Sequence, residues 1–381
     1  MRSRRPTSCA YRLTVGLILS LLVLLVALLS GKDLEEFLDD LLLKDTAKEE
    51  TAVSGDWYDL YFTEPINEDN WALHTGSAVE TALIDAINGA QQSIYGALFE
   101  LNMESITQAL IAAERRGVDV KLVFDDLHAI QDEESTVEEL DGIIEYHSDN
   151  RSALMHHKFL VFDEARVWMG AMNFTHNGIY NNNNNAVLIR STLLAQNYLA
   201  EFREMYDDGV FTRRGDTRQT PNPRLNIDGT LIETFFSPED GTAIENRLEE
   251  LIRESDDSIR VMAFVLTLNR LGNALIVEHN AGVDVQAIFE ARGSNQGQMV
   301  PMGCAGIPVK TDGNPNTFHH KVMIFDGEIV AFGSFNFSAS ARDDNSENMI
   351  IVHNAAFAQA FINEFNKRFN DPEADIPNLS C

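Results

Sequence analysis

The residues best suited to chemistry occur in one pattern that the chain carries twice. Residues 156–173 read HHKFLVFDEARVWMGAMN, and residues 319–336 read HHKVMIFDGEIVAFGSFN. Both copies have His, Lys, Asp, Gly and Asn at matching positions, offset by 163 residues at every match. A single His-x-Lys triplet arises by chance, whereas two five-point matches at one offset indicate an internal duplication. Two sets of His, Lys and Asn therefore predict one site built from two halves.

This set of side chains suits the cleavage of a phosphodiester. The reaction needs a nucleophile, an acid for the leaving oxygen and cations for the non-bridging oxygens. Histidine serves as nucleophile or acid because its ordinary pKa lies near neutrality. His156 and His319 are the candidates for these two tasks. Lys158 and Lys321 would bind the non-bridging oxygens as point charges, and the asparagine amides would donate hydrogen bonds to the same oxygens.

We expect a site without metal or cofactor, because the two lysines neutralise the phosphate. The doubled histidines do not indicate a metal site, since adjacent strand residues point to opposite faces and no third ligand has a useful spacing. The candidate catalytic residues are His156, Lys158, Asp163, Asn173, His319, Lys321, Asp326, Asn336 and Glu347. The candidate substrate-binding residues are Lys158, Lys321, Asn173, Asn336 and Ser334.

The duplicated element resembles the signature of the phospholipase D superfamily, H-x-K-x4-D-x6-G-S-x-N, and the resemblance covers about residues 57–370. It implies that one histidine attacks phosphorus to give a phosphohistidine while the other protonates the leaving group. Water then hydrolyses the intermediate, with the second histidine as base. The resemblance also implies that Asp163 and Asp326 are structural, each pairing with nearby groups in its own half.

The two copies differ downstream of the motif. The second continues with Ser-Glu-Asn at 346–348, and the first has Asn-Asn-Asn at 183–185. In the superfamily an acid at this place orients a catalytic histidine, often that of the opposite half. Carried over, Glu347 orients His156, and a carboxylate partner stabilises an imidazolium and fixes its tautomer. His319 has only an asparagine. We therefore expect His156 to be the nucleophile and His319 the general acid.

The repeat extends upstream and predicts the elements that position the motifs. Each half has an amphipathic helix, a strand, a second helix that ends at glycine, and further strands typical of a buried sheet. The first helices begin with Ser-Ala-Val-Glu (77–80) and Thr-Ala-Ile-Glu (242–245), which match the capping box. The pattern predicts an α/β fold of two similar sandwich halves, mixed sheets flanked by helices, related by a pseudo-twofold.

An apolar segment at residues 13–29 precedes these halves. It is just long enough to cross a bilayer core of about 30 Å, and its flanks are basic before it and acidic after it. These flanks predict a cytoplasmic N-terminus and a catalytic body outside the cytoplasm. A cleaved signal peptide, which would give a secreted protein, also fits, but the poor cleavage site at Ser30-Gly31 favours a retained transmembrane helix.

The expected division of the chain follows from these features. It is 1–31 for the cytoplasmic tip and the anchor or signal peptide, 32–55 for an acidic linker, 56–212 for the first half, 213–230 for a linker, and 231–381 for the second half. An acidic insertion at 126–152 is expected to flank the mouth of the cleft. Both motifs lie in one chain, so we expect an active monomer. A disulfide between Cys304 and Cys381 is possible if the body is exported.

Charge bears on the choice of substrate. The chain has a formal charge of −30, and residues 32–381 hold 25 basic and 59 acidic side chains, a net charge of −34. Nucleic-acid binders usually show the opposite balance, although adaptation to salt explains the acidity equally well. We expect hydrolysis of phospholipid headgroups, with phosphatidylcholine giving phosphatidate and choline. The alternatives are a membrane-anchored nuclease of the same superfamily, a phosphatidyltransferase, and an inactive phosphate-binding scaffold.

Overall fold

A computed structural model describes residues 52–66, 74–211, 219–293 and 297–381. The apolar segment at 13–29 and most of the linker expected at 32–55 lie outside these residues. Within the described ranges, no helix has the length and apolar character that crossing a membrane requires.

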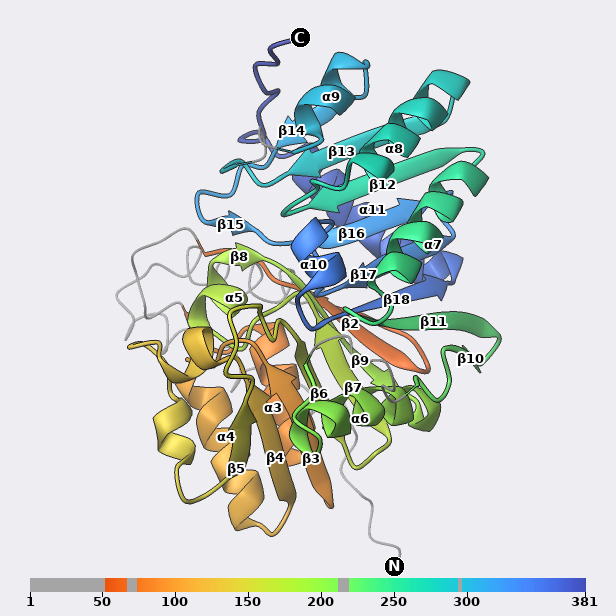
Figure 1. Cartoon of the computed structure of the whole chain (residues 1–381). Coiled ribbons are helices and arrows are strands. Elements are labelled where there is room, and N and C mark those ends of the chain that lie inside the picture. Colours follow the sequence, from red (N-terminus) through yellow and green to blue (C-terminus); the bar gives the residue numbers. More distant parts are fainter. Residues whose placement is uncertain (1–51, 67–73, 212–218, 294–296) are drawn as a thin grey trace, which may run out of the picture. The chain divides into compact units, whose positions relative to one another are not determined.

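The first half is a mixed sheet with helices on its faces (Figure 1). Its strand order is β1-β2-β9-β7-β6-β3-β4-β5. The strands are β1 (Ala52–Ser54), β2 (Tyr58–Phe62), β3 (Ser93–Leu98), β4 (Asp119–Phe124), β5 (Glu145–Ser148), β6 (Lys158–Phe162), β7 (Arg166–Gly170) and β9 (Asn185–Arg190). The helices are α3 (Ala78–Asn88), α4 (Glu104–Arg115), α5 (His176–Tyr180) and α6 (Thr192–Tyr206). A π-helical turn (Asp126–Ile130) and a 3-10 turn (Val137–Leu140) lie between β4 and β5.

The second half repeats this topology. Its strand order, β10-β11-β18-β17-β16-β12-β13-β14, matches that of the first half position by position. The strands are β10 (Arg224–Ile227), β11 (Thr230–Ser237), β12 (Ser258–Ala263), β13 (Asp284–Phe289), β14 (Val309–Thr311), β16 (Lys321–Phe325), β17 (Ile329–Gly333) and β18 (Glu347–His353). The helices are α7 (Gly241–Glu254), α8 (Asn269–Ala281), α9 (Met299–Cys304), α10 (Ala339–Asp343) and α11 (Ala355–Phe369). The prediction of two mixed α/β halves is confirmed.

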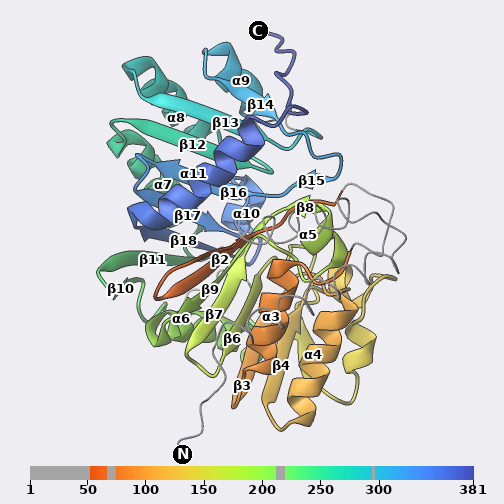
Figure 2. The ribbon, with the colours of Figure 1, turned by 180° about the vertical axis from the view of Figure 1, so that it is seen from behind.

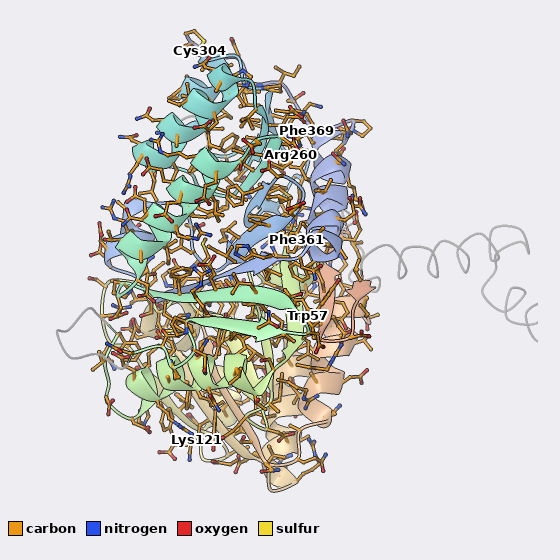
Figure 3. The ribbon with its side chains drawn as sticks, turned by 90° about the vertical axis from the view of Figure 1, so that its right-hand side faces the viewer. Trp57, Lys121, Arg260, Cys304, Phe361 and Phe369 are labelled. Carbon is orange, nitrogen blue, oxygen red and sulfur yellow. A yellow bond between two sulfur atoms is a disulfide. The ribbon has the colours of Figure 1, made fainter. Side chains whose placement is uncertain are left out.

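Apolar side chains join the halves through a shared core. One buried cluster combines the inner faces of both sheets with α6 and α11, while α3 and α4 cover the outer face of the first sheet and α7 and α8 that of the second. Figure 2 shows α11 lying across its sheet, with α7 and α8 behind. At the junction, Trp57 stacks on Phe357 at 5.8 Å between ring centroids, and Phe62 meets Phe361 edge-on at 5.2 Å. Figure 3 labels Trp57 and Phe361. Such aromatic contacts add to the apolar area that holds the halves together.

Both sheets begin earlier than the linker ranges allow. The edge strand β1 falls within the expected linker 32–55, and β10 falls within the expected linker 213–230. In β10, Leu225 and Ile227 are buried while their neighbours are exposed, which is the alternation of a strand with one covered face. The polar composition of these segments concealed a short edge strand in each.

The helix starts differ between the halves. Ser77 caps α3 as expected, because its Oγ accepts from the backbone N–H of Glu80 at 3.2 Å. The second capping box is wrong, since α7 starts at Gly241 and Thr242 therefore lies inside the helix. A Cβ on Gly241 would lie 1.8 Å from the carbonyl oxygen of Arg342, so the close approach of α10 requires glycine here.

The disulfide that the sequence analysis left as a possibility is present. Cys304, at the end of α9, forms a disulfide with Cys381, and Figure 3 shows Cys304 at the end of the second half remote from the first. The bond fixes the C-terminal segment beside β14, where Thr311 and Asp375 also exchange backbone hydrogen bonds.

Candidate active site

The two motifs meet through reciprocal backbone contacts between the halves. The N–H of His156 donates to the carbonyl oxygen of Ser346 at 2.9 Å, and the N–H of His319 donates to that of Asn183 at the same distance. The short strands β8 (Asn182–Asn183) and β15 (Thr317–Phe318) pair in parallel at the second of these contacts. A shift of 163 residues relates His156 to His319 and Asn183 to Ser346, so the two contacts are equivalent, as the expected pseudo-twofold requires.

Each motif histidine is held by a side chain from the opposite half. Nδ1 of His156 lies 2.7 Å from Oε2 of Glu347, and Nδ1 of His319 lies 2.9 Å from Oδ1 of Asn184. Both expected contacts are confirmed. Because Nδ1 is engaged in each ring, Nε2 is the atom left for a substrate, and no described residue makes a hydrogen bond to Nε2 of either ring.

The motif lysines lie beneath the histidines. Lys158 and Lys321 are 1% and 0% exposed, and each Nζ donates to the carbonyl oxygen of the histidine two residues before it, at 2.6 and 2.8 Å. Burial lowers the pKa of Lys158 to about 7. Burial and the neighbouring Lys158 lower the pKa of Lys321 well below its usual range. Two buried ammonium groups whose pKa values are lowered in this way are suited to an anion, which would restore both charges.

Burial and the two lysines also lower the pKa values of the motif histidines. Burial is the largest cause that lowers the pKa of His156 well below its usual range, followed by Lys158 and Lys321. Burial, Lys321 and Lys158 likewise lower the pKa of His319 well below its usual range. Both rings are therefore neutral at neutral pH while no anion is bound. A neutral imidazole has the free lone pair that a nucleophile needs.

Glu347 is fully buried at the start of β18. Burial raises the pKa of its carboxyl to about 7, while Lys158 and hydrogen bonds from Ser334 and Asn345 oppose that rise. The carboxylate accepts from the Nδ1–H of His156, and so fixes the tautomer in which Nε2 carries the lone pair.

The motif asparagines differ in their partners. Nδ2 of Asn173 donates to Oε2 of Glu100 at 2.6 Å, and no hydrogen bond from the amide of Asn336 is found to any described residue. The buried Oδ1 atoms of Asn173 and Asn336 both lack a hydrogen-bond partner among the described residues. One amide N–H of Asn173 therefore donates to a carboxylate. From the sequence, this amide was expected to donate to the phosphate, and Glu100 was not among the expected partners.

Ser334 does not face a substrate. It is fully buried, and its Oγ accepts from the backbone N–H of Asn348 at 2.9 Å. Its hydroxyl therefore supports the segment that carries Glu347. The assignment of Ser334 to substrate binding is a correction to the sequence analysis, because the side chain points to the neighbouring strand β18.

The motif aspartates lie at the far ends of the motif strands. Asp163 follows β6 and accepts from the backbone N–H groups of Gln91, Gln92 and Ser93 at 2.7 to 3.1 Å. Asp326 follows β16 and accepts from three consecutive N–H groups, those of residues 256–258, at 2.9 to 3.1 Å. Both have φ near +50°, which aspartate tolerates better than most residues. They brace the turns before β3 and β12, which is the structural role that the resemblance implies, and not the catalytic role for which they were candidates.

Two pairs of supporting residues were missed. Phe99 and Phe264 lie under the lysines, with Nζ 4.4 Å from one ring centroid and 4.7 Å from the other. The same rings meet His156 and His319 edge-on. The signal was present in the sequence, since SIYGALFEL and SIRVMAFVL align with these phenylalanines in one column.

The second missed pair consists of carboxylates. Asp125 accepts from the backbone N–H of Met155 at 3.0 Å, and Glu290 accepts from that of Phe318 at 2.6 Å. Each therefore fixes the residue directly before a motif histidine. Both follow the strand pair VDVKLVF and VDVQAIF, so an alignment of the halves would have placed an acid at this position in each.

The two sides of the site differ chemically at Glu100. This residue lies beside Lys158 and Asn173, whereas the corresponding residue after Phe264 is Val265. Burial raises the pKa of Glu100, and Lys158 and His128 oppose that rise. His128 comes from the insertion 126–152 and packs against Phe99 with 4.6 Å between ring centroids. The insertion therefore reaches the site, and it makes the side of the first half more polar than the side of the second.

A duplicated α/β fold that joins two His-x-Lys elements is the architecture of the phospholipase D class. A family model described as cardiolipin synthase, PLD-like domain, matches residues 83–206 and 248–369. The chain belongs to this phospholipase D-like family.

Named relatives are phosphodiester hydrolases. The mitochondrial cardiolipin hydrolase of Xenopus tropicalis is 29% identical over 131 residues, which are 33% of this chain and 61% of that protein. The match thus spans less than two thirds of that relative's length. The phospholipase D of Rickettsia bellii is 32% identical over 157 residues, 39% of this chain and 77% of that protein. The crystal structure of phosphatidylserine synthase from Haemophilus influenzae matches with a TM-score of 0.58 at 13% identity, covering 78% of this chain and 85% of that one, a likeness of fold.

Proposed function

We propose that the protein is a phosphodiester hydrolase of phospholipase D type that acts through a phosphohistidine on His156. The observation that carries this proposal is the pair of imidazoles with Nδ1 engaged from the opposite half and Nε2 free, above two buried lysines. One Nε2 can attack phosphorus while the other protonates the leaving oxygen.

The proposed first step forms a bond between Nε2 of His156 and phosphorus and breaks the bond from phosphorus to the leaving oxygen. His319 gives the proton that this oxygen needs. His319 is neutral in the free protein. The negative charge of the bound phosphodiester raises the pKa of the ring, so that Nε2 takes a proton from solvent when the substrate binds and passes it to the leaving oxygen. In the second step water attacks phosphorus, the phosphorus–nitrogen bond breaks, and His319 takes the proton.

The different partners of the histidines support the choice of nucleophile. The carboxylate of Glu347 stabilises positive charge on His156, which develops when Nε2 bonds to phosphorus. The neutral amide of Asn184 stabilises the His319 imidazolium less, so that ring gives up its proton more readily. Trapping the full chain with substrate and mapping the phosphorylated residue tests this assignment. A phosphate found on His319 would make His319 the nucleophile and His156 the general acid.

We propose a phospholipid as the substrate, with hydrolysis of phosphatidylcholine to phosphatidate and choline. The net charge of −34 on residues 32–381 and the carboxylate of Glu100 in the site both oppose a polyanion. The names of the relatives, phospholipase D and cardiolipin hydrolase, support a lipid. The disulfide supports a body outside the cytoplasm, held by residues 13–29 and active as a monomer.

The deciding experiment offers the full chain, without added metal, vesicles of phosphatidylcholine or cardiolipin and a single-stranded oligonucleotide. His156→Ala is the test variant, and His353→Ala at the far end of β18 is the control. Choline release that disappears only with His156→Ala is the expected result. Cleavage of the oligonucleotide without lipid turnover would make the protein a nuclease, and transfer to an added alcohol in preference to water would make it a phosphatidyltransferase.

A further inference from the structure

A second histidine follows each motif histidine and takes no part in the proposed reaction. His157 and His320 are fully buried. Nδ1 of His157 lies 3.1 Å from Nδ2 of Asn348, and Nδ1 of His320 lies 3.0 Å from Nδ2 of Asn185. An amide nitrogen only donates, so Nδ1 accepts in both rings and the proton lies on Nε2.

The Nε2 atoms reach the last helix of each half. Nε2 of His157 lies 3.0 Å from Oε1 of Glu201 on α6, and Nε2 of His320 lies 3.3 Å from Oε1 of Glu364 on α11. Each second histidine therefore joins a helix carboxylate of its own half to an asparagine of the other half.

The two asparagines directly follow the residues that hold the motif histidines. Asn348 comes after Glu347, and Asn185 comes after Asn184. All four side chains are 0% exposed. A buried residue held at one position fixes the backbone of its neighbour, so the second histidines control where Glu347 and Asn184 lie.

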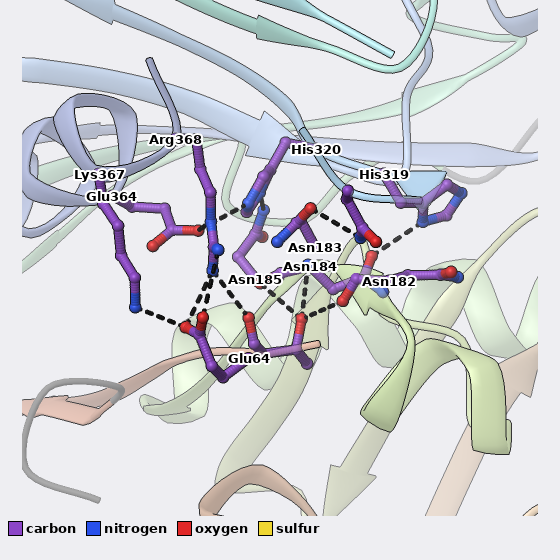
Figure 4. Close-up of polar contacts among 12 residues, drawn as sticks. Glu64, Asn182, Asn183, Asn184, Asn185, His319, His320, Glu364, Lys367 and Arg368 are labelled. Atoms are coloured by element: carbon purple, nitrogen blue, oxygen red, sulfur yellow. Dashed lines mark hydrogen bonds and ion pairs between the residues drawn. The ribbon is translucent and has the colours of Figure 1, made fainter. Parts of the chain in front are cut away.

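The link in the second half is reinforced by an ion network that crosses between the halves (Figure 4). Nε of Arg368 donates to Glu364 at 2.7 Å. The same guanidinium donates to the carbonyl oxygen of Thr63 at 3.2 Å and to Oε2 of Glu64 at 3.1 Å. Lys367 also pairs with Glu64. Among the described residues of the first half there is no equivalent network, because Met205 stands where the second half has Arg368.

The helix carboxylates differ accordingly. Arg368 and the bond from His320 overcome burial and lower the pKa of Glu364 to about 2. Burial and Asp240 raise the pKa of Glu201 to about 8. The acceptor for His320 is thus a permanent carboxylate, whereas the acceptor for His157 is a protonated carboxyl at neutral pH.

We infer that His320, Glu364 and Arg368 are positioning residues for His319: through Asn185 they hold Asn184, which aims Nε2 of His319 at the leaving oxygen. His157 holds Glu347 through Asn348 and so positions His156 in the same way. The inference rests on the proposed function, since it assigns the two links to the acid and to the nucleophile of that reaction.

The two links are distinguished by the leaving group. An alkoxide leaves phosphorus only with the proton from His319, whereas p-nitrophenolate leaves without a proton. Misplacement of His319 therefore slows the release of choline and spares the release of p-nitrophenolate. Misplacement of His156 slows both, because both reactions need the bond from nitrogen to phosphorus.

The experiment uses the full chain in single turnover, with enzyme in excess. It compares choline release from phosphatidylcholine with p-nitrophenolate release from bis(p-nitrophenyl) phosphate. His320→Phe is expected to slow choline release about 10- to 100-fold, as loss of a supporting hydrogen bond does elsewhere, and p-nitrophenolate release by less than about threefold. His157→Phe is expected to slow both alike. His320→Gln, which can accept from Asn185 and donate to Glu364, restores much of the choline rate.

A second variant distinguishes a loss of positioning from a loss of folding. Arg368→Met places the first-half residue in the second half, and Arg253→Met, an exposed arginine of the same half, is its control. Arg368→Met is expected to repeat the selective loss of choline release. Equal losses on both substrates in His320→Phe and Arg368→Met, or no loss in either, would overturn the inference. A wild-type chain that cleaves neither substrate would instead overturn the proposed function, and the inference with it.

Discussion

The carboxylate of Glu347 lies 2.7 Å from Nδ1 of His156, although 191 residues separate them along the chain. We expect Glu347→Gln to lower kcat about 100-fold and to leave KM nearly unchanged, because the amide cannot stabilise the charge that develops on His156. Steady-state choline release measures this. Glu328→Gln, an exposed residue of the same half, is the control. A wild-type kcat in Glu347→Gln would remove the carboxylate from the mechanism.

The pKa shifts predict a narrow optimum of kcat/KM near pH 7. As the pH falls through about 7, Glu347 gains a proton and no longer stabilises the His156 imidazolium. As the pH rises through about 7, Lys158 loses its proton and the site loses a cation. Both limbs lower the activity. Glu347→Gln should abolish the acid limb and keep the basic one, and a pH profile that is unchanged in this variant would contradict the assignment.

Glu100 is expected to select against anionic substrates. A carboxylate beside the phosphate repels further negative charge and attracts an ammonium group. Glu100→Gln and Glu100→Val, the residue of the second half, should lower the preference for phosphatidylcholine over phosphatidylglycerol about tenfold. The ratio of the two initial rates measures this, with Glu133→Gln as an exposed control. An unchanged ratio would show that Glu100 does not sense substrate charge.

Asp163 and Asp326 are expected to stabilise the protein without acting in the reaction. Asp163→Ala leaves three backbone N–H groups without their acceptor, so the free energy of unfolding should fall by about 2 kcal/mol. Thermal unfolding measures this, and Glu164→Ala, whose side chain is 58% exposed, is the control. The activity of the folded fraction should stay near that of the wild type; a large loss of kcat at full stability would return Asp163 to the site.

The disulfide is expected to contribute stability and no catalytic function. It closes a loop across 77 residues, and a crosslink of this kind contributes about 2–4 kcal/mol. Cys381→Ser, or reduction of the wild type, should lower the melting temperature and leave the p-nitrophenolate rate unchanged at 25 °C. Because β14 is the edge strand of the second sheet, the bond lies away from the strands that carry the motif. Loss of activity together with full stability would contradict this separation.

The duplication made much of the site predictable. A constant offset between the motifs predicted one site built from two halves. The contacts of Glu347 and Asn184 with the opposite histidines were implied by the resemblance to the phospholipase D superfamily. The motif spacing could not show that Lys158 lies in the site and Asp163 outside it. The motif gives only the order of residues along the chain, whereas the two residues lie at opposite ends of the strand β6.

Other features depend on neighbours that no spacing encodes. Glu100 has no counterpart in the second half, so the repeat gave no signal for it. The partners of His157 and His320 come from α6, α11 and the opposite half, and only the packing of these elements brings them together. The edge strands β1 and β10 were missed because they have only three and four residues, and in β10 only two of these are apolar and buried.

The exchange of partners across the pseudo-twofold explains why a fused chain differs from an association of identical subunits. A polypeptide with one half alone would need a second copy to complete its histidine. Symmetry would then give both imidazoles the same neighbour, asparagine twice or glutamate twice. Covalent joining frees the copies to mutate independently, so that one imidazole keeps a carboxylate and the other an amide. Asymmetry between two chemically identical rings is thus a property that only the tandem arrangement can encode.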